Sequence, residues 1–448
     1  MVESLDADYL VVGAGAMGMA FSDEILARNP TDRVVLVDKR ARPGGHWNDA
    51  YPFVSLHQPA AYYGVNSEKL GSGGAALASG VEVLAYYERV LRKWSGRGRL
   101  RHFPMCEYRG EGGFRSLVES DRGYQVQVRK KIVDASYMNV QVPSTRPPAY
   151  EVSPEASLVP LNELPRVREP RAGYAVIGAG KTGMDAVLFL LEQGVEPSRI
   201  TWVMPNDAWL LDRAQIQPGR LTQSGLASQT ETFAGADSLK SLFEGLEALD
   251  RILRLDPSVW PTKYRCATVT RDELQALRRV ENVVRMGRVL RVEADSLVLE
   301  QGVRPMSPET LYVDCTADGL AKREVRPVFD GNHITLQSLF MCQQVFSAAV
   351  TALVESRYED EASQNDLCQV VPHPEFSRDF VAAIAVSQGN MLKWGKHFGR
   401  WLRKSRLCML HHEPLYRLIV SGFRERPHVS AAAENIARIL RQEFPTDA

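Results

Sequence analysis

The feature that most constrains the fold is a glycine-rich segment that occurs twice, each time between a short apolar run and a stretch of helical pattern. In the first copy, the apolar residues 9–12 are followed by Gly13, Gly15 and Gly18 in GxGxxG spacing. The first glycine permits a tight turn, the second lets the backbone approach a pyrophosphate, and the third lets the helix pack closely on the strand. The pattern predicts a strand–turn–helix unit whose helix, residues 16–27, points its N-terminus at the phosphates of a dinucleotide.

An acidic residue completes this first copy. A second strand is predicted over residues 33–37, and it ends at Asp38. A carboxylate at this place can hydrogen-bond the hydroxyls of an adenosine ribose. The order of strand, glycines, helix, strand and acid therefore predicts a dinucleotide site that includes all three glycines and Asp38.

The second copy follows the same order with different details. A strand over residues 174–177 precedes Gly178, Gly180 and Gly183, and a helix is predicted over residues 181–193. Lys181 and Thr182 give this copy the text GAGKTG, which also suggests a P-loop. We reject that interpretation because a P-loop has a glycine five residues before its Gly-Lys pair, where this chain has an alanine.

The end of the next strand indicates which nicotinamide cofactor binds here. Met204 stands where the first copy has its acid, so a cofactor with a 2′-phosphate is not repelled. Arg213 lies close in sequence and could contact that phosphate, whereas Asp207 argues mildly for the other cofactor. We therefore predict NADPH in preference to NADH.

A short phrase after the first copy resembles a known family. Gly44, Gly45, His46 and Trp47, followed by a Tyr-Pro pair at 51–52, are similar to the Gly-Gly-x-Trp phrase of flavin-containing and Baeyer–Villiger monooxygenases. Residues 158–173 lack the FxGxxxHxxx(W/Y) fingerprint of these families, which suggests a separate branch.

The resemblance implies an α/β fold with two Rossmann-like dinucleotide-binding domains, β-meanders and added C-terminal helices. It implies FAD at the first site and NADPH at the second. We expect residues 1–165 to begin the FAD domain, residues 166–311 to form the NAD(P)H domain with a helical excursion over 214–280, and residues 312–448 to complete the FAD domain.

The resemblance also implies a reaction. NADPH reduces FAD, O2 adds to the flavin, and the C4a-hydroperoxide transfers one oxygen atom to a small organic substrate, while the protein positions and dries the site. Two alternatives stay open: a flavin-dependent NAD(P)H reductase or dehydrogenase without oxygen transfer, and a non-catalytic binding module on a flavin fold, as in the GDP-dissociation inhibitors.

The candidate catalytic residues are His57 and Gln58, which follow the Tyr-Pro pair at the offset where Baeyer–Villiger enzymes have an aspartate near the flavin. A histidine here could hydrogen-bond the flavin edge or donate a proton, since its unperturbed pKa is near 6.5. The alternative is a structural histidine that bonds a backbone carbonyl and holds the loop before Pro59.

Two strand patterns suggest a repeated closing element in the two halves. Residues 124–130 alternate as a strand, residues 131–138 read as a second strand, and the text Asp134-Ala135-Ser136 ends it. Asp314-Cys315-Thr316 ends a comparable strand in the second half. Such strand ends can lie close to a bound dinucleotide.

Composition narrows the partners and the location. Equal numbers of basic and acidic residues, 54 each, give no excess of charge for nucleic acid. The six cysteines show no CxxC spacing, so we expect isolated reduced thiols rather than a disulfide or a zinc site. An acidic start and the absence of an apolar run of about 18 residues favour the cytoplasm.

A basic stretch from Lys393 to Arg406 is predicted to be an amphipathic helix. Leu392, Trp394 and Phe398 recur at near-helical spacing on its apolar side. Its basic side suggests either a solvated surface of the domain or a contact with anionic lipid or an acidic carrier protein.

Overall fold

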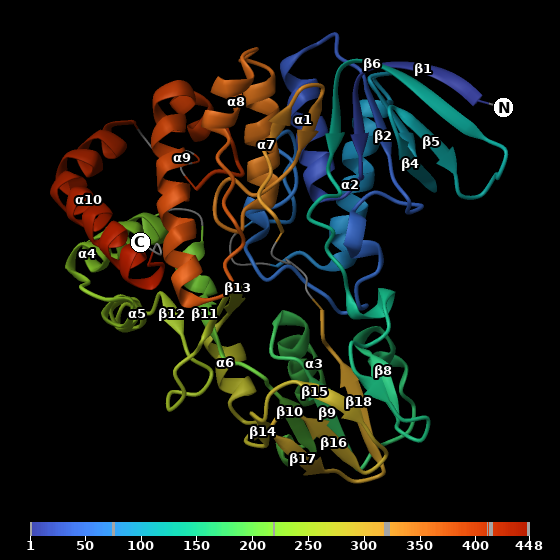
Figure 1. The fold of residues 1–448 in the computed structure, drawn as a ribbon, viewed down its shortest axis with the longest axis vertical. Coiled ribbons are helices and arrows are strands. Elements are labelled where there is room, and N and C mark those ends of the chain that lie inside the picture. Colours follow the sequence, from blue (N-terminus) through green and yellow to red (C-terminus); the bar gives the residue numbers. More distant parts are fainter. Residues whose placement is uncertain are drawn as a thin grey trace.

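The computed structural model describes residues 2–73, 77–217, 220–317, 323–409, 411 and 415–445, without the side chains of residues 220–227 and 415–427. In Figure 1 these residues form an α/β protein with two sheets of mainly parallel strands and a third module rich in helices. The predicted fold class, with its two Rossmann-like units, meanders and C-terminal helices, is confirmed.

The first sheet collects strands from both halves of the chain. Its strand order is β19-β20-β6-β1-β2-β3, with β5 paired to β6 and β4 paired to β5. The strands are β1 (Val2–Val12), β2 (Val34–Val37), β3 (Leu100–Phe103), β4 (Cys106–Gly110), β5 (Gly113–Ser116), β6 (Gly123–Asp134), β19 (Phe329–Asp330) and β20 (His333–Thr335). Neighbours from β20 to β3 run parallel, and apolar side chains are buried on both faces, as parallel sheets require.

Helices α1 (Ala16–Arg28), α2 (Gly80–Ser95) and α7 (Gln344–Glu355) pack beside this sheet, and α1 contacts both of the others. Helix α7 is buried over most of its length because its sequence is almost entirely apolar or small. The short helices are η1 (Gly45–Asn48), η2 (Ala60–Tyr62), η3 (Pro143–Thr145), η4 (Leu161–Arg166), η5 (Pro197–Arg199) and η6 (Arg213–Ile216).

The second sheet is parallel throughout and has the order β14-β10-β9-β18-β8. A four-stranded sheet, β17-β16-β15-β7, adjoins it, and its strands β15, β16 and β17 form an antiparallel meander. The strands are β7 (Glu151–Val152), β8 (Leu158–Pro160), β9 (Gly173–Ile177), β10 (Ile200–Val203), β14 (Val283–Val284), β15 (Val289–Val292), β16 (Ser296–Leu299), β17 (Gly302–Pro305) and β18 (Thr310–Asp314). Helix α3 (Lys181–Glu192) joins β9 to β10.

The third module combines the excursion of the second half with the C-terminal helices. Its elements are β11 (Ala208–Asp212), β12 (Ile252–Leu253), β13 (Lys263–Val269), α4 (Arg220–Gly235), α5 (Leu239–Ala248), α9 (Ser377–Lys404) and α10 (Leu415–Glu443). Helix α6 (Arg271–Leu277) packs against α3, and α8 (Glu361–Leu367) contacts β19, α7 and α9. Figure 1 shows α10 beside α4 and α9, and these elements share an aromatic core around Trp209, Phe243 and Phe380.

The structure differs from one sequence-based prediction about strands. Residues 124–134 form one continuous strand, β6, because it pairs with β1 along the whole length of β1. Strands β7 and β8 pair with β15 and β18. Because β7 and β8 have only two and three residues, only their pairing reveals which sheet each belongs to. The expected domain limits stay a prediction.

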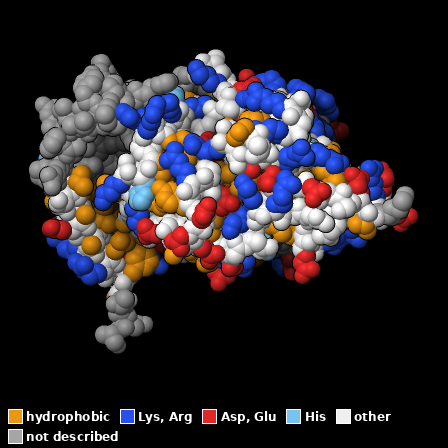
Figure 2. Space-filling model, turned by 90° about the horizontal axis from the view of Figure 1, so that it is seen from above, with side chains coloured by type: hydrophobic (Ala, Val, Ile, Leu, Met, Phe, Trp, Pro, Cys, Tyr) orange, Lys and Arg blue, Asp and Glu red, His pale blue; other side chains and the backbone are white. Residues whose placement is uncertain are grey.

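The basic stretch is helical, within α9, and its apolar side is buried at Trp394, Phe398 and Trp401. Two assigned positions were wrong: Leu392 is 64% exposed, and Arg406 lies outside α9. The Arg406 guanidinium is buried and donates to the carbonyls of residues 61, 63 and 65. Figure 2 shows many Lys and Arg side chains on the face seen from above, with acidic ones toward one edge. The lipid or carrier-protein contact stays a prediction.

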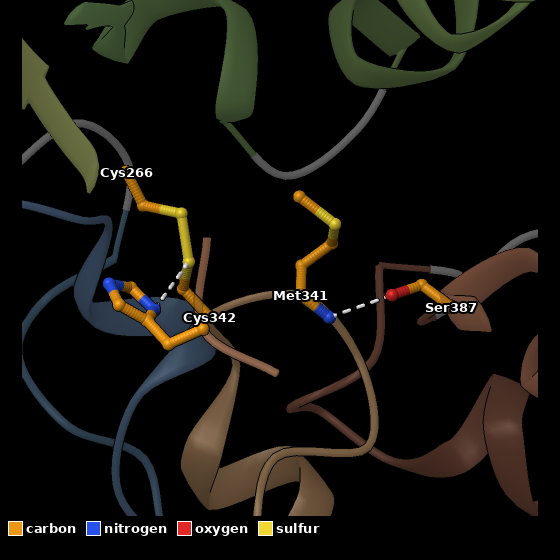
Figure 3. The surroundings of a disulfide bond; sticks show 5 residues. Cys266, Met341, Cys342 and Ser387 are labelled. Carbon is orange, nitrogen blue, oxygen red and sulfur yellow. Dashed lines mark hydrogen bonds between the residues drawn. A yellow bond between two sulfur atoms is a disulfide. The ribbon is translucent and has the colours of Figure 1, made fainter. Parts of the chain in front are cut away.

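The expectation of isolated reduced thiols is wrong for two of the six cysteines. Cys266 and Cys342 form a disulfide (Figure 3). Cys106, Cys315, Cys368 and Cys408 are buried thiols outside any disulfide. The pair is 76 residues apart in sequence, so spacing gives no sign of it. Among the described residues, no helix has the length and apolarity needed to cross a membrane.

Candidate functional site

The first glycine loop has the geometry that its spacing predicts. Gly13 has a positive φ of 106°, and its N–H donates to the Val37 carbonyl at 2.8 Å. A Cβ on Gly18 would lie 1.9 Å from the Gly13 oxygen, so only glycine lets α1 pack this closely on the loop. Gly15 begins α1 with φ −74°, which places its backbone at the helix N-terminus.

Asp38 lies at the end of β2 and closes the loop from the other side. Its carboxylate accepts the Ala14 N–H at 2.6 Å and the Arg40 N–H at 2.7 Å. The two oxygens of a carboxylate offer about four acceptor sites, so two remain for ribose hydroxyls. Its position at the strand end, beside the glycine loop, suits the role that its place in the sequence predicts.

The second pair of glycines lies directly on the first loop. The Gly44 N–H donates to the Ala14 carbonyl at 2.8 Å, and a Cβ on Gly45 would lie 2.9 Å from the Gly15 Cα. Next to them, the rings of His46 and Trp47 stack with centroids 5.4 Å apart, and burial lowers the pKa of His46 to about 4. Close backbone contact thus explains the glycine at position 45, and a φ of 116° favours the glycine at position 44.

The second glycine loop repeats the first. Gly178 has φ 133°, and a Cβ on Gly183 would lie 2.0 Å from the Gly178 oxygen. At Gly180 an added Cβ would meet no described atom within 4 Å, so this backbone is open on its outer side. Lys181 begins α3 and forms an ion pair with Asp185, one turn along the helix, while Thr182 is partly buried beside it.

The two predicted strand ends, at Asp134 and Asp314, have the same local construction. The Ala135 N–H donates to the Val12 carbonyl at 2.9 Å, and the Cys315 N–H donates to the Ile177 carbonyl at 2.9 Å. In both, the preceding aspartate accepts a backbone N–H from the residue two positions on. A Cβ on Gly178 would lie 2.8 Å from the Cys315 oxygen, so the strand end touches the glycine loop.

The N-termini of α1 and α3 differ from those of α2, α5, α6 and α8. Serine, threonine or aspartate side chains accept N–H groups at the starts of those four helices. Helices α1 and α3 begin at Gly15 and Gly180 without such a bond. Their first N–H groups therefore suit an anionic ligand, as in dinucleotide-binding folds.

Residues 46–58 connect the two loops. The Tyr51 hydroxyl donates to the same Asp185 carboxylate that pairs with Lys181. The Phe53 ring stacks on Phe189 of α3, with centroids 4.3 Å apart. This segment therefore begins on the first glycine loop and is held against α3 at Asp185 and Phe189.

His57 lies where this segment reaches the third module. Its carbonyl accepts from the Arg213 Nε at 2.9 Å and from the Thr268 hydroxyl. Its Nδ1 atom is buried without a hydrogen-bond partner among the described residues. Burial and the cations of Lys181 and Arg213 lower the pKa of His57 to about 3. The pKa of His57 therefore lies far below the unperturbed value near 6.5, and the imidazole is neutral at neutral pH. Gln58 follows it and is partly buried.

Arg213 has a different environment from the one expected. Its guanidinium pairs with Glu273 at 2.9 Å and donates to the His57 carbonyl, and only 6% of its side chain is exposed. Arg285 lies closer to the end of β10. It directly follows β14, which pairs with β10, and the Met204 N–H after β10 donates to the Val284 carbonyl. Its side chain is 29% exposed and pairs with Asp207 at 2.7 Å and with Asp256 at 3.3 Å.

Sequence reasoning missed Asp185, Thr268 and Arg285. None of them belongs to a spaced motif, and each joins the site through a contact between distant segments. A weak signal existed for Asp185 alone, because Lys181 and Asp185 have the i, i+4 spacing of a helical ion pair.

The chain is similar in sequence to a known family model and to two mycobacterial proteins. Residues 11–65 match the family model described as NAD(P)-binding Rossmann-like domain. Uncharacterized proteins of Mycobacterium tuberculosis and Mycobacterium bovis are each 44% identical over 463 residues, covering 98% of this chain and 85% of each relative.

Solved structures share the fold at low identity. A polycyclic ketone monooxygenase from the fungus Thermothelomyces thermophila superposes with TM-score 0.52 and 12% identity, covering 96% of this chain and 89% of that one. An open structure of a cyclohexanone monooxygenase gives 0.50 and 12%, covering 98% and 99%.

Proposed function

The chain belongs to one protein family with these mycobacterial proteins and has the fold of flavin-dependent monooxygenases, and we propose on this basis that it is an FAD- and NADPH-dependent monooxygenase. The observation that carries the proposal is the segment of residues 46–58, which joins two glycine loops of the same construction. NADPH at the second loop can then pass electrons to FAD at the first loop within a single chain.

The residues present fit both cofactors. At the first loop, the open helix N-terminus and the Gly15–Gly45 contact suit a pyrophosphate, and Asp38 suits the adenosine ribose of FAD. At the second loop, the open backbone of Gly180 and the N-terminus of α3 suit the pyrophosphate of NADPH.

The bound flavin, reduced by NADPH, supplies the chemistry that activates O2. In the overall reaction, NADPH, a proton, O2 and the substrate give NADP⁺, water and a substrate carrying one oxygen atom. The protein's part is to hold the two cofactors and to keep water from the reacting atoms. His57 contributes a neutral imidazole, which can form a hydrogen bond through its unpartnered Nδ1.

Labelled oxygen tests this proposal. The purified protein is incubated with NADPH, ¹⁸O2 and a panel of ketones and thioethers, and products are examined by mass spectrometry. A monooxygenase transfers one ¹⁸O atom to a product and uses NADPH only when O2 is present. Two results together would favour the reductase alternative. The protein would oxidise NADPH under nitrogen when an artificial electron acceptor is added, and the ketones and thioethers would gain no ¹⁸O under ¹⁸O2.

We propose that Arg285, rather than Arg213, contacts the 2′-phosphate of NADPH. Arg285→Ala should raise the KM for NADPH about tenfold, because one charge-assisted contact of about 1.4 kcal/mol is lost, and should leave the KM for NADH nearly unchanged. Steady-state kinetics with both cofactors measures this.

Arg213→Ala is the matched comparison. It should lower the melting temperature without changing the preference for NADPH, since it removes the hydrogen bond to the His57 carbonyl and the ion pair with Glu273. Equal use of NADH and NADPH by the native enzyme would contradict the assignment of Arg285. Loss of the NADPH preference in Arg213→Ala but not in Arg285→Ala would contradict it too.

His57→Ala should leave a yellow, stable protein that still oxidises NADPH but releases hydrogen peroxide in place of product. The ratio of product to peroxide should fall roughly 2- to 10-fold, the effect of one lost hydrogen bond of a neutral group, about 0.5–1.5 kcal/mol. Because the pKa of His57 is about 3, the imidazole stays neutral above pH 5, and the native ratio should show no step near pH 6.5 that depends on His57.

His397→Ala serves as the control, because this exposed histidine of α9 bonds only Tyr358 among the described residues. A His57→Ala protein that loses flavin and melting temperature together, with the product ratio unchanged, would show that the histidine is structural.

A further inference from the structure

Three distant segments converge around the disulfide of Cys266 and Cys342. Cys266 belongs to β13, Cys342 to the turn before α7, and His373 to the segment that leads into α9. Figure 3 shows the bond between the two sulfur atoms, and the Nδ1 of His373 lies 3.7 Å from the Cys342 sulfur. The two sulfur atoms and one imidazole nitrogen all lie within 4.8 Å of one another.

The backbone around this cluster is held from several sides. The Tyr264 N–H donates to the Glu375 carbonyl at 2.9 Å, which fixes β13 beside the His373 segment. The Met341 N–H donates to the Ser387 hydroxyl at 2.9 Å, and Figure 3 shows the Met341 side chain turned away from the disulfide. Cys266 and Met341 have φ values of 55° and 41°, which non-glycine residues rarely adopt. Such positions persist only where surrounding contacts hold them, and they are frequent at functional sites.

The donor set has the chemistry of a zinc site. Two thiolates and an imidazole are the ligands that Zn²⁺ prefers, at about 2.3 Å for sulfur and about 2.0 Å for nitrogen. The two cysteine Cα atoms are 6.8 Å apart, at the upper end of the range of about 4.4–6.8 Å usual for disulfides. The sulfur atoms can therefore separate around an ion without the chains having to move apart. Two thiolate charges would balance the charge of the ion, and Cys342 and His373 are partly exposed, so water can reach a fourth position.

We propose that reduction of the Cys266–Cys342 disulfide creates a site for a thiophilic divalent cation, Zn²⁺ in the first place, bound by both sulfurs and the His373 imidazole. A dithiol reductant supplies two electrons and two protons, the S–S bond breaks, and the reductant becomes a disulfide. When the ion binds, the two thiols release their protons and two sulfur–metal bonds form.

The site would tether β13 to the turn before α7 in two ways. In the oxidised state the link is covalent, and in the reduced state the metal bridges the same residues. Reduced protein without metal lacks both links. This property is independent of the proposed oxygenase reaction, because none of the three residues lies in the two glycine loops or the segment of residues 46–58.

Metal titration tests the proposal. The flavin-containing protein is reduced with a dithiol, desalted under nitrogen and titrated with Zn²⁺ or Co²⁺, and bound metal is counted by mass spectrometry after gel filtration. We expect one equivalent in reduced protein, none in oxidised protein, and a sulfur-to-cobalt charge-transfer band with Co²⁺. His373→Gln should weaken Zn²⁺ binding about 100-fold, because one of three protein ligands is lost.

The controls separate this site from the other cysteines. Cys106→Ser removes a free cysteine of β4 and should leave uptake unchanged. His373→Gln keeps the disulfide intact, so it reports on the site even if cysteine variants fold poorly. Reduced protein without stoichiometric uptake, or uptake that persists in the Cys266→Ser/Cys342→Ser protein, would overturn the proposal.

Discussion

Gly15→Val should give a folded but colourless protein. The φ of Gly15 is −74°, which any residue can adopt, and an added Cβ would lie 3.6 Å from the Gly45 Cα, an ordinary contact. The branches of valine reach further, into the space where the pyrophosphate of FAD should lie. Loss of two hydrogen bonds of about 1.5–3 kcal/mol each weakens binding about 100-fold or more.

Absorbance at the flavin band, normalised to protein, measures the flavin content, and circular dichroism checks the fold. Gly15→Ala should have an intermediate content, because a single methyl group fills less of the space. A folded Gly15→Val protein with full flavin would show that FAD does not bind at this loop.

Gly180→Val should give the opposite pattern, a yellow protein that NADPH reduces poorly. Gly180 has φ −83°, and an added Cβ would meet no described protein atom within 4 Å. The substitution therefore costs the fold little, and its side chain would occupy only the place proposed for the pyrophosphate of NADPH. The KM for NADPH should rise about 100-fold, by the same loss of contacts to the helix N-terminus.

The rate at which NADPH reduces the flavin under nitrogen measures the effect directly, and the loss of the flavin's yellow colour reports that rate. The two glycine variants control for each other, because each should damage one cofactor and spare the other. If Gly180→Val reduced its flavin at the native rate, the second loop would have no role in binding NADPH.

The local construction of both nucleotide sites could be predicted from the sequence. Helices α1 and α3 begin at the residues that the glycine spacing indicates, and Asp38 lies at the end of β2 beside the first loop. These features depend on residues close in the chain: a positive φ that favours glycine, and a helix that can approach only where no Cβ intervenes.

The partners of the site residues could not be predicted in the same way. Arg213 binds the carbonyl of a residue 156 positions away, and its charge helps to lower the pKa of that residue, His57. Charge effects on a pKa depend on distance and burial, and neither is known before the chain has folded. Arg285, rather than Arg213, lies near the end of β10 because β14 pairs with β10, and that pairing joins segments about 80 residues apart in the chain.

The sequence by itself thus determined two Rossmann-like units and the construction of their glycine loops, because each unit is specified by a short run of consecutive residues. Only the tertiary structure decided that β8 joins the second sheet, that residues 46–58 connect the two loops, and that Cys266 meets Cys342 and His373. Those contacts join segments far apart in the chain, and they form through packing of whole elements rather than through any local preference.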